Sequence, residues 1–147
     1  MKRTKKTPAM EEQVAPRTYQ EVSDFIQDDL AYSLKILQEN VEKFAAEFVK
    51  DPDYRMEWGE QIGRDAAELE FRRRIACQMD SGLGLAEAME SLAGELRTAL
   101  LTNRFRANST SAFHNAQQGA RADAARYLLE MLTIRINELK KVSPPPA

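Results

Sequence analysis

The 147-residue chain contains a single histidine, His114, and a single cysteine, Cys77. Catalysis by either side chain usually requires a second residue that activates or orients it, and neither has such a partner in a recognisable motif. Zinc sites usually need several His or Cys ligands, which this composition does not supply. We therefore predict a protein that is not an enzyme and that holds no metal or cofactor.

Acidic pairs three residues apart are the other candidate for chemistry, because that spacing points two carboxylates from one helix face toward one magnesium ion. All-α nucleotide pyrophosphohydrolases use such pairs. Glu57 with Glu60 and Glu87 with Glu90 have this spacing. Random placement of 23 acidic residues produces nearly as many pairs as the chain contains, and both pairs lie off the apolar helix faces. A magnesium-dependent pyrophosphohydrolase is thus the third interpretation.

Arg72, Arg73 and Arg74 are consecutive. Neighbouring helical residues are about 100° apart, so these side chains point in three directions and cannot form one basic surface. Arg73 falls on an otherwise apolar helix face, and an antiparallel hairpin would bring it near Asp28 and Asp29 of the preceding helix. We predict an internal ion pair of Arg73 with one of these carboxylates, with a partner-facing Arg73 as the alternative, and a solvent-facing Arg74.

Arg97, Arg104 and Arg106 form a second basic group, in which Phe105 separates the last two arginines. An arginine-aromatic-arginine run in a loop could hold phosphate and stack a base. Together with a basic N-terminal arm, this group supports the alternative function, a nucleic-acid-associated adaptor. The simpler interpretation is that arginines at the end of a helix complement its dipole.

Several large side chains fall on unexpected helix faces. Leu101 and Phe105 lie on the polar side of their helix, and Phe71 is displaced from the apolar face of its own. Large apolar side chains away from the core indicate a contact surface, so we predict that these three residues bind a protein partner. Arg121 and Arg135 fall within the apolar arc of the last helix, which indicates either buried paired charges or a subunit interface.

Four helical segments must position these residues. Apolar side chains recur every three or four positions over residues 18–51, 53–80, 85–105 and 111–141. No segment alternates as a strand does. We predict an all-α, four-helix bundle-like domain that begins with a long helical hairpin, with the last helix at its centre.

Local signals mark the helix ends. Thr18 and Glu21 have the spacing of a capping box, and Pro52 should end the first helix and begin the second. Gly82 suits the left-handed geometry that follows a helix. Gly59 and Gly63 weaken the second helix but, lying four residues apart, allow another helix to approach closely.

Composition indicates one domain over residues 18–142, between a basic disordered arm (1–17) and a proline-rich tail (143–147). No apolar run is long enough to span a bilayer, and the basic start lacks the apolar core of a signal peptide. A lone cysteine agrees with a reducing compartment. We expect a cytoplasmic protein without membrane contact, located in the host cytoplasm or the virion if it is viral.

The stretch from Asp51 to Arg74, with its Asp-Pro-Asp-Tyr start, Trp58 and the arginine run, resembles the helical segment that follows the DNA-binding domain in some phage terminase small subunits. The resemblance covers about 24 residues. The region before it reads as one long helix rather than a helix-turn-helix, so DNA recognition does not follow. The resemblance implies a ring-forming packaging component.

We interpret the chain as a non-enzymatic helical interaction or assembly protein that acts through protein contacts. A homo-oligomer or a larger assembly is the expected state, and the setting could be a virus or a mobile element. The nucleic-acid adaptor is the alternative, because phosphate contacts by a basic arm and an arginine group need no catalytic residues.

Overall fold

The computed structural model describes residues 18–50 and 56–142. Helices account for 87% of these residues and no strand occurs among them. The helices are α2 (Tyr19–Lys50), α3 (Met56–Asp80), α4 (Leu85–Leu101) and α5 (Ala112–Lys141). The predicted all-α class with four helices is therefore confirmed. The predicted arm and tail lie outside the described residues.

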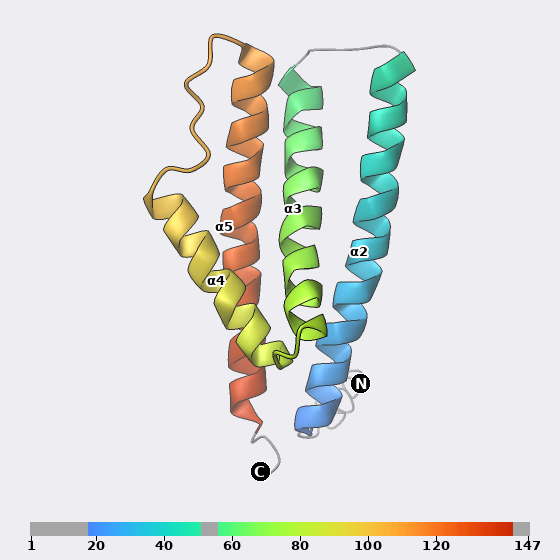
Figure 1. Ribbon diagram of the computed structural model, residues 1–147, viewed down its shortest axis with the longest axis vertical. Coiled ribbons are helices and arrows are strands. Elements are labelled where there is room, and N and C mark those ends of the chain that lie inside the picture. The colour runs from blue at the N-terminus through green and yellow to red at the C-terminus, as the bar shows by residue number, and fades with distance from the viewer. Residues whose placement is uncertain (1–17, 51–55, 143–147) are drawn as a thin grey trace, which may run out of the picture.

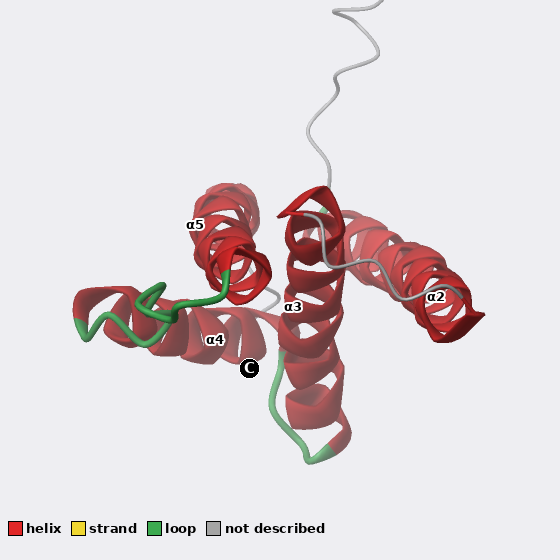
Figure 2. Ribbon diagram, turned by 90° about the horizontal axis from the view of Figure 1, so that it is seen from above, coloured by secondary structure: helices red, strands yellow, loops and turns green. Residues whose placement is uncertain are grey.

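The four helices pack side by side with one oblique crossing (Figure 1). α2 and α3 run in opposite directions, and α4 crosses obliquely before a loop leads to α5. α3 and α5 run in the same direction. Seen from above, α3 lies between α2 and α5 (Figure 2), and it contacts all three other helices. α5 also contacts the three other helices, so the central position predicted for the last helix is shared by α3 and α5.

Two predicted helix ends are confirmed in atomic detail. The Thr18 backbone N–H donates to Glu21 Oε1 (2.8 Å), and the Glu21 N–H donates to Thr18 Oγ1 (3.1 Å). These reciprocal bonds satisfy two of the amide groups that a helix start leaves unpaired. Gly82 follows α3 with a φ of 114°, a value that other residues adopt with strain.

α3 and α5 approach each other closely along small residues. A Cβ atom added to Gly59 would lie 2.6 Å from the Phe113 carbonyl oxygen, and one added to Gly63 would lie 3.1 Å from the Gln117 Cα and closer still to its carbonyl oxygen. Neither glycine has room for a side chain. The four-residue spacing noted in the sequence therefore does permit close helix approach.

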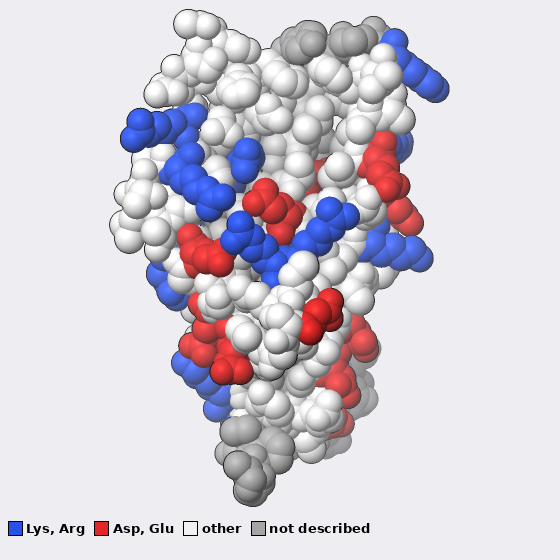
Figure 3. Space-filling model, in the orientation of Figure 1, with Lys and Arg blue, Asp and Glu red and all other residues white. Residues whose placement is uncertain are grey.

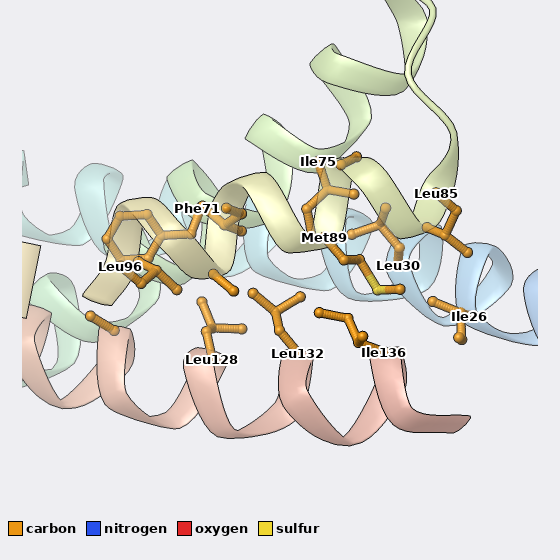
Figure 4. Close-up of a cluster of buried hydrophobic side chains, with 14 of the residues drawn as sticks. Ile26, Leu30, Phe71, Ile75, Leu85, Met89, Leu96, Leu128, Leu132 and Ile136 are labelled. Carbon is orange, nitrogen blue, oxygen red and sulfur yellow. The ribbon is translucent and has the colours of Figure 1, made fainter. Parts of the chain in front are cut away.

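One hydrophobic core joins all four helices. In Figure 4, side chains from every helix point into a common interior. Met89, Leu92 and Leu96 of α4 are among its most completely buried members, and it extends from Val22 to Leu139. A single contiguous core agrees with one domain over residues 18–142.

The second half of α2 is less well covered. Leu30 and Leu37 of its apolar face are buried, whereas Val41, Phe44 and Phe48 remain partly exposed. Phe44 makes an edge contact with Trp58 of α3, with ring centroids 5.5 Å apart. None of the described helices is long and apolar enough to span a membrane.

Candidate interaction surface

Two of the three residues predicted to bind a partner are buried. Phe71 is 2% exposed and Phe105 is 6% exposed. Their rings contact each other at an interplanar angle of 70°, with centroids 6.3 Å apart. The prediction that both face a partner is wrong for this conformation. Leu101 is 86% exposed, so a contact role for that residue stays a prediction.

Phe105 is buried because α4 ends four residues earlier than predicted. Asn103 adopts a left-handed conformation (φ 55°), and the Arg104 N–H donates to the Ala99 carbonyl oxygen (2.9 Å). This bond is typical of a Schellman motif, in which the chain reverses directly after the helix. The reversal turns Phe105 toward α3. A helical wheel continued past the end of α4 therefore does not describe the direction of its side chain.

Phe71 is buried because α3 carries a second inward face. The most regular apolar series in the sequence of this helix is Trp58, Ile62, Ala66 and Leu69. This series faces α2, and most of its members are only partly buried. The fully buried face repeats every four residues instead. It consists of Gly59, Gly63, Ala67, Phe71 and Ile75.

The predicted ion pair of Arg73 is also wrong. Arg73 is exposed and donates a hydrogen bond to the Gln38 side-chain oxygen, not to Asp28 or Asp29. Asp29 instead lies 3.8 Å from the Arg135 guanidinium. Arg73 meets α2 at Gln38, nine residues beyond Asp29, so the predicted hairpin placed Arg73 too near the start of α2.

Arg121 and Arg135 of α5 have charged partners. This agrees with the prediction of paired charges, which was the alternative to a subunit interface. Arg121 lies 3.8 Å from Glu70, and Arg135 lies 3.0 Å from Glu138. The apolar arc of α5 therefore accommodates these arginines through paired charges.

Arg74, predicted to face solvent, is held by two carboxylates. It forms an ion pair with Glu95 of α4 and lies 3.9 Å from Glu70. We expect Arg74→Ala to lower the free energy of unfolding by about 1 kcal/mol, as half-exposed networked pairs do, and Arg73→Ala to change it much less. Urea denaturation of both variants measures this difference, and a larger loss for Arg73→Ala would contradict the pairing.

The second basic group does not act as one unit. Arg97 lies in a groove between α4 and α5 with Lys140, whereas Arg104 lies over the Phe105 ring, 5.8 Å from its centroid. Arg106 is exposed in the loop. Because Phe105 is buried, it cannot stack a base as the nucleic-acid interpretation requires.

A long groove follows α3, with α2 and α4 as its walls. We call it the α3 trough, and it encloses about 580 Å³. Its lining residues are Val41, Ala66, Leu69, Glu70, Arg73, Arg74, Cys77, Gln78 and Glu95. From Ala66 to Gln78 the α3 helix rises about 18 Å, which is the length of a three-turn helix.

The α3 trough combines an apolar floor with a charged rim. Val41, Ala66 and Leu69 supply the apolar surface, and the thiol of Cys77 is exposed beside them. Basic and acidic side chains alternate across the middle of the face shown in Figure 3, with few charged groups above them. An apolar centre with a polar rim is the usual composition of a protein-binding surface.

An arginine cluster begins in this trough and continues outside it. It consists of Arg73 and Arg74, which line the trough, and of Arg104 and Arg121, which do not. The guanidinium groups of Arg121 and Arg104 lie 5.3 Å and 5.8 Å from the Phe105 ring centroid. Three helices and a loop supply these residues and their carboxylate partners. Sequence reasoning missed this cluster because no local spacing brings its members together.

A separate groove between α3 and α5 contains Glu68 with Arg64, Asp123 and Tyr127. Burial raises the pKa of Glu68, and the neighbouring Asp65 raises it further, while Arg72 and Arg64 partly offset this effect. A raised pKa means that folding disfavours the charged form of this carboxyl group.

We expect Glu68→Gln to stabilise the fold at neutral pH and to lose this advantage in acid. The wild-type contribution of Glu68 is fully present below the pKa of an unfolded glutamate and is lost as the pH rises through the higher folded pKa. Urea denaturation at several pH values measures this trend, with Glu130→Gln as the exposed control. If Glu68→Gln raised the free energy of unfolding equally at every pH, the raised pKa of Glu68 would be contradicted.

The two acidic pairs considered for magnesium do not converge. Glu57 and Glu60 lie at the start of α3, and Glu87 and Glu90 lie at the start of α4. About 30 Å of helix separates Glu60 from the end of α3, where the turn to α4 begins. Glu87 instead accepts a hydrogen bond from the Gly84 N–H (3.1 Å). Within residues 18–50 and 56–142, no group of three potential ligands could hold a metal ion.

Fold and site together define a four-helix protein with a grooved, mixed-charge surface. Comparisons of the chain with protein-family models, curated proteins and solved structures gave no match. The resemblance of residues 51–74 to terminase small subunits, and the packaging role that it implies, stay predictions.

Proposed function

We propose that this chain is a non-catalytic helical interaction module whose α3 trough receives a helical segment of another protein chain. The observation that carries the proposal is the shape and lining of the α3 trough. It is elongated along a central helix, apolar at its floor and charged at its rim. Amphipathic helices bind grooves of this kind through their apolar face.

A second copy of the chain is one possible source of that segment, and the expected homo-oligomer would then form through the trough. Exposed Leu101 is the other candidate contact for self-association. Sedimentation of the chain at several concentrations measures its mass. Leu101→Asp should leave the fold intact, and a reduced mass for this variant would assign the contact to Leu101 instead of the trough.

The single cysteine of the chain provides a direct test, because Cys77 lines the α3 trough and its thiol is accessible. A small environment-sensitive fluorophore on Cys77 should respond to an amphipathic helical peptide of about 12 residues, the number that spans the trough. A scrambled peptide of the same composition, which has no apolar face, should give no response.

The matched control moves the label away from the trough. In Cys77→Ser with Ala31→Cys, the fluorophore lies on an exposed position of α2 that does not line the trough. This control should not respond to either peptide. Equal responses to the amphipathic and scrambled peptides, or from both label positions, would refute the proposed function.

A further inference from the structure

The arginine cluster contains more positive charge than its carboxylate neighbours balance. Glu70 and Glu95 are the two acidic residues that line the α3 trough. Glu95 pairs with Arg74, and Glu70 lies 3.9 Å from Arg74 and 3.8 Å from Arg121. Both carboxylates are therefore already engaged by Arg74 and Arg121.

Arg73 and Arg104 have no carboxylate within ion-pair distance among the described residues. Arg73 donates to the neutral side-chain oxygen of Gln38. The Gln38 amide nitrogen in turn donates to Glu42 Oε2 (2.6 Å), and this bond orients the amide. Glu42 therefore binds Gln38 and does not form an ion pair with Arg73. Arg104 is exposed and contacts the face of the Phe105 ring. Two guanidinium groups thus remain available for an anionic partner.

These two arginines differ in their position relative to the trough. Arg73 lines the trough and turns toward α2, where Gln38 is located. Arg104 does not line it, but Arg104 and Arg121 of α5 both contact the Phe105 ring, and Arg121 lies 3.8 Å from Glu70, which does line the trough. A segment in the α3 trough would therefore meet Arg73 directly and would meet Arg104 where it extends past Glu70 and Arg121.

We infer that the partner segment is an acidic amphipathic helix, with carboxylates beside its apolar stripe. The apolar stripe contacts Val41, Ala66 and Leu69, while the flanking carboxylates pair with Arg73 and Arg104. Complementary charges at the rim of an interface select the partner and speed its association. This inference rests on the proposed function and names the partner chemistry for the same site.

The test compares two synthetic helical peptides that share one apolar face and differ only in their polar positions, which are glutamate in one and lysine in the other. Each is titrated into the full-length, isotope-labelled chain, and NMR shifts of trough amides and of the arginine Nε groups give the site and the Kd. The acidic peptide should bind at least about tenfold more tightly at low salt. The difference should shrink at high salt, where exposed charges are screened.

Substitutions assign the preference to the two unbalanced arginines. Arg73→Gln and Arg104→Gln should each weaken binding of the acidic peptide several-fold, and the double variant Arg73→Glu with Arg104→Glu should favour the lysine peptide. Arg126→Gln is the matched control, because Arg126 is exposed on α5 and Asp123 already balances its charge at 2.9 Å. It should change neither Kd.

The possible outcomes separate this inference from the function on which it rests. If both peptides shift the trough amides with equal Kd, or the lysine peptide binds more tightly, the acidic partner is refuted and the interaction module stands. If neither peptide shifts these amides, the proposed function itself fails. If a DNA duplex displaces the acidic peptide and binds more tightly through Arg73 and Arg104, the ligand is a nucleic acid and the inference is overturned.

Discussion

Gly63→Ala should lower the free energy of unfolding by about 3 kcal/mol, the upper part of the range for overpacking a tight interior. In an ordinary helix the same change would be stabilising, because alanine has the higher helix propensity. At Gly63 the added methyl group would overlap the Gln117 backbone, which cannot move aside as a flexible side chain would. The strain is relieved only if α3 and α5 separate, and that separation would open the core around Phe71.

Gly119→Ala is the matched control for this prediction. Gly119 also lies within a helix, but a Cβ atom built there meets nothing within 4 Å. The free energy of unfolding of this variant should therefore rise by up to about 1 kcal/mol from helix propensity alone. Urea denaturation followed by circular dichroism measures both changes. If the Gly63 and Gly119 variants were equally stable, the close packing of α3 on α5 would be incorrect.

The helices and two of their ends could be predicted from sequence because the determining interactions are local. The Thr18 and Glu21 capping box joins residues three apart, and the glycine at position 82 acts through its own backbone angles. Apolar periodicity reports one face of each helix. These signals require no knowledge of which helices become neighbours, which is why they are reliable in a single sequence.

The packing of α3 against α5 could be predicted only in part. Its contact face begins with Gly59, Gly63 and Ala67, whose small side chains contribute little to an apolar pattern. The series from Trp58 to Leu69 is the stronger apolar signal in the sequence, and Phe71 lies off that series. The four-residue spacing of the glycines was the available signal, and it correctly indicated close approach by another helix.

The candidate site could not be predicted, because its charges meet only after the helices pack. Arg74 of α3 pairs with Glu95 of α4, and Arg121 of α5 reaches Glu70. Each pairing depends on helix rotations that a sequence pattern fixes poorly. The sequence pattern assigned an ion pair to Arg73, whereas Arg74 forms one with different carboxylates, and an error of four residues in the end of α4 placed Phe105 on the surface.

Phe71→Ala should cost about 3–5 kcal/mol of unfolding free energy, the usual loss for truncating a buried phenylalanine. Phe71 is almost fully enclosed at the junction of α3, α4 and α5. The substitution also removes its ring contact with Phe105. Domains of this size are typically stable by about 5–15 kcal/mol, so the variant should remain folded only marginally. Phe105→Ala should cost less, because its loop can adjust around the smaller side chain.

The exposed Phe25 of α2 supplies the control, since it undergoes the same substitution at a 42% exposed position. Phe25→Ala should destabilise the fold far less than Phe71→Ala under identical urea denaturation. A double-mutant cycle of Phe71 with Phe105 should show coupling of about 1 kcal/mol, as aromatic pairs do. If Phe71→Ala instead kept full stability and lost only partner binding, Phe71 would belong to the contact surface that its sequence position suggested, and the core assignment would be wrong.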